Sequence, residues 1–152
     1  CSAGVGAEVT VSLGGKIDDE FSQPVETTAR VVLISENHEG DACERGRVEI
    51  GRVVLLKSGP VHIVVMAAAG FAICHPMLYQ HLGLDVDQAR AVVVKTASNF
   101  QYFDDWRRAL IRVDSPGMTQ SDLSAFTWTR TPRPIFPFDV DVTWEPDVGG
   151  NH

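Results

Sequence analysis

The chain has 152 residues, of which 44% are hydrophobic and 22% charged, which is the size and composition of one soluble globular domain and not of a disordered or fibrous protein. Its formal net charge of -7 argues against nucleic acid and membrane surfaces as partners, because phosphate backbones and anionic lipids repel an acidic protein. The longest apolar run, residues 61–74, contains His62 and Gly70 and is too short to cross a bilayer, so no transmembrane helix is expected.

The cysteines and the first residues bear on the setting of the chain. Cys1, Cys43 and Cys74 are odd in number and widely spaced, whereas a secreted disulfide framework has an even and denser set, so we expect a reducing, cytoplasmic setting. The chain opens Cys-Ser-Ala-Gly, with neither a Met nor a signal-peptide pattern. We interpret it as part of a longer protein, with natural processing as the alternative.

Strands dominate the first half of the predicted fold. The clearest one covers residues 25–35, whose second half is apolar on both alternating faces and is expected to be buried on both sides. A polar stretch, residues 36–45, indicates an exposed loop after it. Lys57, Ser58 and Gly59 suit a hairpin turn between the next two strands. The strands predicted in this half are residues 8–13, 25–35, 47–56 and 60–67.

The second half mixes short helices with two more predicted strands. Pro76 is tolerated at a first helical position, and Ser98 can cap a later helix whose aromatic residues fall at three-to-four spacing. A run of β-branched residues and alanine at 91–95 favours a buried strand. Helices are predicted at residues 76–82, 100–108 and 121–126, and strands at residues 91–95 and 109–113.

The C-terminal region is rich in proline, which leaves little room for a helix or a central strand after Thr129. We expect an extended tail that packs on the domain through Ile135, Phe136 and Phe138. The predicted fold class is therefore mixed α/β. It is a single domain over residues 1–152, with a strand-rich sheet, a few short helices and an extended proline-rich C-terminal tail.

No pattern in the chain predicts catalysis or metal binding. A metal site needs converging His, Cys or carboxylate ligands, and the histidines form neither an HxH nor an HExxH motif, so ordinary buried or surface histidines are the simpler account. There is no G-x-S-x-G turn for a nucleophilic serine, and Cys74 follows an apolar run, where a thiol is usually a small core side chain. We assign no catalytic residue and no metal ligand. The histidines are His38, His62, His75, His81 and His152.

Two places in the chain offer polar groups for binding a substrate. Lys16 follows a Gly-Gly turn, while Lys95 and Asn99 bracket a loop that also holds Thr96 and Ser98. Such a loop offers a cation, an amide, hydroxyls and the N–H groups of a helix start, which suit a carboxylate or a carbonyl oxygen of a peptide-like substrate. We expect Lys95 and Asn99 to face a shared cleft. The alternative is that Lys95 extends into solvent and Asn99 only caps the helix.

An ordered set of short motifs resembles the C-terminal domain of the microcystinase C (MlrC) family, a family of metal-dependent hydrolases. The resemblance runs from a Gly-Gly-Lys turn to a closing Arg-Pro-aromatic-Pro-x-Asp segment and covers nearly the whole chain. The motifs are Ala-Gly-Val-Gly-Ala (3–7), Leu-Gly-Gly-Lys (13–16), Pro-Val-x-x-x-Ala-Arg-Val (24–31), Val-Val-Val-Lys-Thr (92–96), Asn-Phe (99–100), Val-Asp-Ser-Pro-Gly (113–117) and Arg-Pro-Ile-Phe-Pro-Phe-Asp (133–139).

The resemblance implies a bacterial parent enzyme of two domains. In such proteins the larger N-terminal domain carries the metal ligands, usually for zinc, and hydrolyses amide or peptide-like substrates, microcystin among them. The present chain would then be an accessory domain that completes the substrate cleft, has no cofactor of its own, and has the N-terminal domain and a small peptide-like substrate as partners. Self-association into a homo-oligomer through an exposed docking patch is a further expectation.

The chain departs from the family pattern at one position of the candidate site. Where the family often has Lys-Ser and then a His before the Phe, this chain has Lys95-Thr96 and then Asn99. An asparagine can donate and accept hydrogen bonds but takes up no proton near neutral pH. The competing hypothesis is a non-enzymatic interaction or scaffold domain that shares only the fold, since fold does not imply function.

Overall fold

The computed structural model describes residues 3–16, 22–41, 47–67, 74–96, 99–106, 109–115 and 122–143, and for residues 37–41 and 47–49 the description covers the backbone alone. The chain divides into two compact units, Cys1–Val113 and Asp114–His152, each with its own internal packing. The expectation of one domain over the whole chain stays a prediction.

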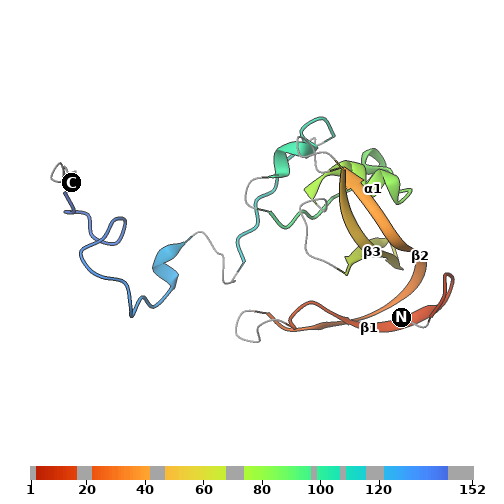
Figure 1. Ribbon diagram of the computed structural model, residues 1–152, viewed down its shortest axis with the longest axis horizontal. Helices are drawn as coiled ribbons and strands as arrows, with labels where there is room; N and C mark the ends of the chain where they lie inside the picture. The colour runs from red at the N-terminus through yellow and green to blue at the C-terminus, as the bar shows by residue number, and fades with distance from the viewer. Residues whose placement is uncertain are drawn as a thin grey trace, which may run out of the picture. The chain divides into compact units, whose positions relative to one another are not determined.

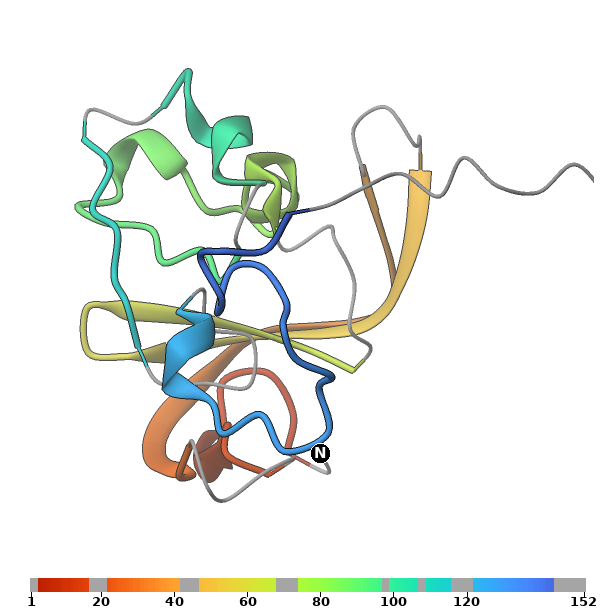
Figure 2. The same cartoon turned by 90° about the vertical axis from the view of Figure 1, so that its left-hand side faces the viewer.

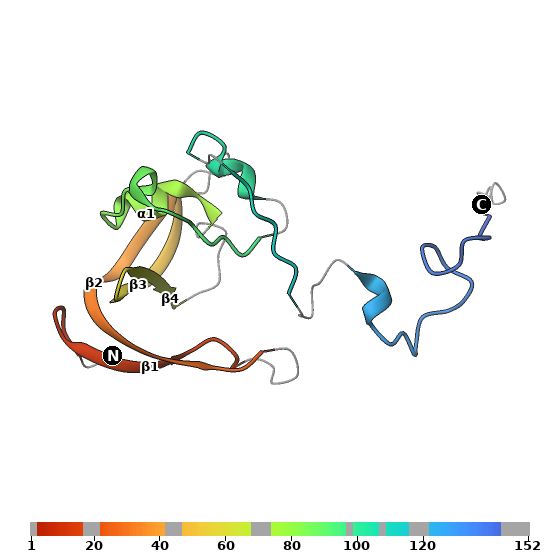
Figure 3. The ribbon, with the colours of Figure 1, turned by 180° about the vertical axis from the view of Figure 1, so that it is seen from behind.

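An antiparallel sheet forms the centre of the first unit (Figure 1). Within the described residues it has four strands in the order β1-β2-β3-β4, so each strand pairs with its neighbour in sequence, and Figure 3 shows β4 beside β3. The predicted strands of the first half are confirmed, and the strand-rich mixed α/β class with them. The strands are β1 (Glu8–Leu13), β2 (Val25–Asp41), β3 (Arg47–Ser58) and β4 (Val61–Met66).

A glycine-dependent turn leads from β1 towards β2. Leu13 is paired with Val25, and side-chain exposure alternates along β1 as the sequence predicts. Gly15 has φ +55°, and a Cβ placed there would lie 2.3 Å from the carbonyl carbon of Gln23. A side chain cannot occupy that space, and the left-handed backbone also favours glycine. Gly15 is therefore required for the approach of the chain to Pro24.

The strand β2 is longer than predicted and bends. It continues beyond Ser35 to Asp41 and pairs there with the start of β3, so the loop predicted at residues 36–45 begins too early; residues 42–45 lie outside the described residues. The register shifts after Ser35 and again at His38. Such bulges bend a strand, and Figure 2 shows β2 and β3 bending together. The polar side chains gave no sign of this part of the strand. It forms because pairing with β3 satisfies the backbone hydrogen bonds, whatever the side chains are.

The sheet has an apolar cluster on each face. One cluster of the described residues joins Val53 of β3 to Leu78 and Leu82, in and just after the helix α1 (Pro76–His81). The other joins Val31 of β2 to Leu56 of β3. Successive residues of a strand point to opposite faces. Val53 and Leu56, three positions apart, therefore belong to different faces.

The predicted burial of β2 on both sides holds in part. Leu33 packs against the cluster of Val53, and Ile34 packs against the cluster of Val31. Val32, directly before Leu33, is 38% exposed. The apolar residues of β2 thus pack into both clusters, and Val32 stays partly exposed to water.

The helices of the first unit are short. α1 begins at Pro76 as predicted, and Nδ1 of His75 caps it by accepting a hydrogen bond from the Met77 amide at 3.2 Å. Gly83, with φ +77°, follows its C-cap, in the left-handed conformation that glycine adopts at helix ends. The α-helix predicted at residues 100–108 is instead a 3-10 helix, η4 (Asn99–Phe103), while residues 107 and 108 lie outside the description. A further 3-10 turn is η3 (Val86–Gln88).

Two predicted strands are wrong. Residues 91–95 and 109–113 have irregular backbone and do not join the described sheet. The burial predicted for residues 91–95 is also wrong, because Val93 is 90% exposed, and Ile111 in the other segment is 82% exposed. β-branched composition measures how well a residue fits a pleated, half-buried surface, and it produces a strand only where a neighbouring strand provides that surface.

The second unit has a short 3-10 helix and irregular chain. The helix is η5 (Leu123–Ala125), which agrees with the prediction of a short helix at residues 121–126. Nε1 of Trp128 donates a hydrogen bond to the carbonyl oxygen of Leu123 at 2.7 Å. The Phe138 ring lies 5.3 Å from the Trp128 ring, so the contacts described for Phe138 lie within this unit. Packing of the tail on the rest of the chain stays a prediction.

Candidate functional site

The loop between Lys95 and Asn99 has a defined conformation at its two ends. The Thr96 amide donates to the carbonyl oxygen of Val94 at 3.1 Å. Oγ1 of Thr96 accepts a hydrogen bond from the Asn99 amide at 3.0 Å, at the point where η4 begins. Thr96 therefore caps η4, a role that the sequence suggested for Ser98, which lies outside the described residues. The structure brings Thr96 and Asn99 together.

Exposure differs among the predicted binding residues. Lys95 is exposed, whereas Thr96 and Asn99 are half-buried. The loop thus combines a cation in water with a hydroxyl and an amide nearer the protein. A shared cleft for Lys95 and Asn99 stays a prediction.

Lys16 belongs to a different part of the fold. It is exposed and directly follows Gly15, at the end of the turn after β1. The close approach of Gly15 to Gln23 fixes the backbone just before the lysine. A role for Lys16 in substrate binding also stays a prediction.

Aromatic contacts attach η4 to α1. The ring of Tyr102 lies 5.3 Å from that of His75, and the ring of Phe103 lies 6.1 Å from that of Tyr79, at angles typical of stable aromatic pairs. Phe103 is buried, whereas Tyr102 is 41% exposed. Of these two residues of η4, Phe103 is therefore the one that packs into the core. These contacts hold η4, and with it Asn99, against α1.

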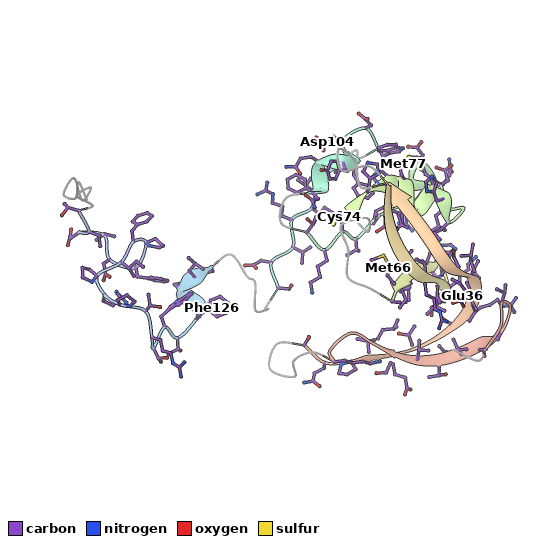
Figure 4. The ribbon with its side chains drawn as sticks, viewed as in Figure 1. Glu36, Met66, Cys74, Met77, Asp104 and Phe126 are labelled. Carbon is purple, nitrogen blue, oxygen red and sulfur yellow. The ribbon has the colours of Figure 1, made fainter. Side chains whose placement is uncertain are left out.

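Cys74 lies directly before His75, the N-cap of α1, and is a buried core residue, as expected (Figure 4). Burial raises the pKa of the Tyr79 hydroxyl, and the nearby Cys74 raises that pKa further. A phenol with a raised pKa stays protonated at neutral pH, so Tyr79 can donate a hydrogen bond and cannot act as a base. Tyr79 therefore contributes to packing and does not act as a base.

In the second unit, residues 133–139 form a loop that is closed by an ion pair between Arg133 and Asp139, which the sequence did not predict. Nε of Arg133 donates to Oδ2 of Asp139 at 2.6 Å, and Nη2 of Arg133 bonds the other carboxylate oxygen. The Ile135 amide donates to Oδ2 of Asp139 at 2.7 Å. The bond from Arg133, followed by that from Ile135, lowers the pKa of Asp139 to about 2. The opposite charges six residues apart were the available signal, but their contact depends on how the intervening chain turns.

The described residues do not fit a metal centre. Zinc sites use converging nitrogen, sulfur and oxygen ligands. In the part of the chain that the structure describes, no group of three or more His, Cys, Asp and Glu residues could hold a metal ion. Nδ1 of His75 accepts a hydrogen bond from the Met77 amide. The sequence indicated only an ordinary histidine at this position and did not predict the helix cap.

No helix among the described residues is long and apolar enough to cross a membrane.

Residues 1–130 match the family model of the MlrC C-terminus. The chain belongs to the MlrC C-terminus family. The match includes the turn at Gly15, the α1–η4 contacts and the Lys95–Asn99 loop, so all the predicted binding residues lie in the family's region of the chain. The Arg133–Asp139 loop lies just beyond the matched residues.

Two longer proteins are similar to this MlrC C-terminal chain. Microcystinase C from Sphingomonas sp. is 27% identical over 139 residues, which are 90% of this chain and 26% of that protein. A crystal structure from Mesorhizobium sp. BNC1, whose protein is called a "putative metallopeptidase", has a TM-score of 0.75 and 26% identity over 94% of this chain and 29% of the other. The chain thus spans between a quarter and a third of the length of these relatives.

The described ends of the Lys95–Asn99 loop offer binding chemistry. At the Lys95–Asn99 loop, the lysine can pair with a carboxylate, and the asparagine amide can donate to a carbonyl oxygen. Neither the amide of Asn99 nor the hydroxyl of Thr96 exchanges a proton near neutral pH. The loop can therefore position a peptide-like group without acting as its acid or base.

Proposed function

We propose that this chain is the C-terminal domain of an MlrC-type amide or peptide hydrolase, in which it completes the substrate cleft and is not catalytic on its own. The observation that carries the proposal is the extent of the two similarities: nearly all of this chain corresponds to about a quarter of Microcystinase C and to a similar share of the metallopeptidase-named structure. Most of each relative, and with it the room for a catalytic centre, lies outside the matched region.

In this proposal the metal belongs to the N-terminal domain of the longer protein. Zinc is the metal expected there, where it would polarise the scissile carbonyl and activate a water molecule. The present chain would hold the substrate. Lys95 would attract a carboxylate of the peptide-like substrate, and Asn99, kept in place by the Thr96 cap and the η4–α1 contacts, would bond a carbonyl oxygen.

Lys16 and Ser98 complete the proposed set of substrate-binding residues. Lys16 is exposed and directly follows Gly15, whose backbone lies close to that of Gln23. A lysine placed in this way attracts an anionic group by charge alone. We place both lysines at the rim of the cleft and include a cytoplasmic setting in the proposal, supported by the free, buried Cys74.

The test uses the full-length product of the gene that encodes this chain. Hydrolysis of linear and cyclic peptides should be measured with and without zinc, for the parent protein and for Lys95→Ala. We expect the variant to raise KM about tenfold or more with a smaller change in kcat, because it removes a binding group and no proton-transfer group. Lys57→Ala, an exposed lysine in β3, is the matched control and should leave KM unchanged.

One outcome would contradict the hydrolase function, and another would contradict only the role of Lys95. A full-length protein that binds zinc and hydrolyses no amide or peptide bond would favour the alternative of an interaction or scaffold domain. Equal KM values for Lys95→Ala and Lys57→Ala would remove Lys95 from the cleft and leave the hydrolase assignment standing.

A further inference from the structure

Two irregular segments of the first unit leave apolar side chains in water. We call residues 91–95 and 109–113 the open segments. Val93 is 90% exposed, Ile111 82% and Val113 81%, although the fold buries comparable residues of β3 almost completely. Five consecutive residues rich in β-branched side chains normally form a strand within a sheet. An exposed apolar set of this kind indicates a surface that another structure covers.

The open segments lie on either side of a packed element in the chain. They flank η4, which is attached to α1 by the Tyr102–His75 and Phe103–Tyr79 ring pairs. The guanidinium of Arg112 also lies 5.6 Å from the centre of the Phe100 ring. The chain therefore enters and leaves a fixed element on either side. A covering structure would find the open segments already positioned, which lowers the entropy cost of docking.

The chemistry of the open segments specifies their partner. Valines at three successive positions, 92–94, place apolar side chains on both alternating faces of an extended chain. Such a strand belongs in a sheet that is covered on both sides. Its partner must therefore provide an edge strand for backbone hydrogen bonds and an apolar layer above it. Two copies of this chain would bring together net charges of -7 each, which opposes their association.

The longer relatives have enough chain outside the match to form such a partner. Both open segments lie within the family match over residues 1–130, and about three quarters of Microcystinase C lies outside its match to this chain. We propose that the open segments are docking strands, and that the remainder of a longer MlrC-type chain covers them with an edge strand and an apolar layer. This inference rests on the proposed function, because it takes the N-terminal domain as the occupant.

Amide hydrogen exchange tests the proposal directly. Exchange at residues 92–94 and 110–113 should be measured in the 152-residue chain and in the full-length gene product. Docking predicts exchange at least about tenfold slower in the full-length protein, because the amides gain hydrogen-bond partners there. The amides of Val53 and Leu55, buried in both proteins, are the internal reference. Equal exchange in both proteins, or a gene that encodes nothing beyond this chain, would overturn the proposal.

Point variants separate docking from folding. Val93→Lys and Ile111→Lys should remove the added protection in the full-length protein and leave the melting temperature of the 152-residue chain unchanged, since both side chains are already exposed. Val5→Lys is the control, because Val5 is 65% exposed and lies outside the open segments. Slowed exchange that appears in the 152-residue chain as its concentration rises would show a second copy as the occupant and overturn the proposal.

The outcomes for docking and for function are distinguishable. Slowed exchange in a full-length protein without hydrolase activity would support docking and contradict the proposed function. Hydrolase activity without slowed exchange would do the reverse.

Discussion

Residues 53–56 and residues 92–94 are similar in composition and opposite in environment. The first set, Val-Val-Leu-Leu, lies in the middle strand pair of the sheet, with Val53 fully buried and Leu55 2% exposed. The second, Val-Val-Val, is irregular, and Val93 is 90% exposed. The difference lies in the neighbours, since β3 pairs with β2 and β4. Residue type provides the tendency to form a strand, and an available strand edge decides whether it forms.

The largest effect is expected for a substitution in the buried strand of this comparison. Leu55→Ala should lower the free energy of unfolding by about 2–5 kcal/mol, because it removes a fully buried side chain and leaves a cavity. Val93→Ala should change it by less than about 0.5 kcal/mol, because the side chain is in water. Urea unfolding of both variants provides the measurement. A loss for Val93→Ala as large as that for Leu55→Ala would mean that the open segments are buried in solution.

The next effect sharpens the role of backbone geometry in the sheet. Gly15→Ala should destabilise the first hairpin by about 2 kcal/mol or more, because its Cβ would clash with the backbone of Gln23 and its φ is positive. Gly14→Ala is the matched control: its φ is also positive, but a Cβ there meets nothing within 4 Å. Unfolding midpoints should fall further for Gly15→Ala. Equal midpoints would show that the close approach carries no cost.

A smaller effect is expected where η4 meets the open segment that precedes it. Thr96→Ala removes the hydroxyl that caps the Asn99 amide and should cost about 0.5–1 kcal/mol of local stability. The Asn99 amide should then exchange faster, as measured by NMR. Thr96→Ser keeps the acceptor oxygen and should exchange like the parent chain. If Ser and Ala behaved alike, the cap would not order the loop.

The smallest effect concerns the Arg133–Asp139 ion pair, which holds its part of the chain by polar contacts and not by strand pairing. The pKa of Asp139 is about 2, below its ordinary value, so the Arg133–Asp139 loop gains stability from the ionised carboxylate. That contribution is fully present above about pH 4 and is lost as the pH falls through about 2. Arg133→Gln should raise the pKa of Asp139 towards its ordinary value, measured by carboxyl NMR titration. An unchanged pKa would exclude the ion pair as the main cause.

The sequence predicted the sheet well because its strands alternate or are apolar throughout. β1, β3 and β4 lie within two residues of their predicted bounds at each end. The polar extension of β2 to Asp41 was not predictable, because pairing with β3 and not side-chain pattern forms it. The strand prediction for the open segments was wrong for the opposite reason, since their side-chain pattern is that of a strand but no strand of the described sheet pairs with them.

The sequence predicted where the helix start lies in the candidate loop but not how it is capped, and the binding role of the loop stays a prediction. Lys95, Thr96 and Asn99 do flank the start of a helix, as the spacing indicated. The cap fell on Thr96 because its hydroxyl, three residues before Asn99, reaches that amide. The His75 cap and the Arg133–Asp139 closure depend on local backbone turns, which residue types alone do not specify.

The strand order of the sheet has a consequence for how the chain folds. Every described pairing joins consecutive strands, so each hairpin can close before the next is made. Loop-closure entropy is then lost in small steps, and such topologies fold faster than sheets built from distant strands. Residues 8–66 contain all of the described pairings, so the sheet can assemble before the open segments have left the ribosome. The folded sheet would then already be in place when the docking strands emerge.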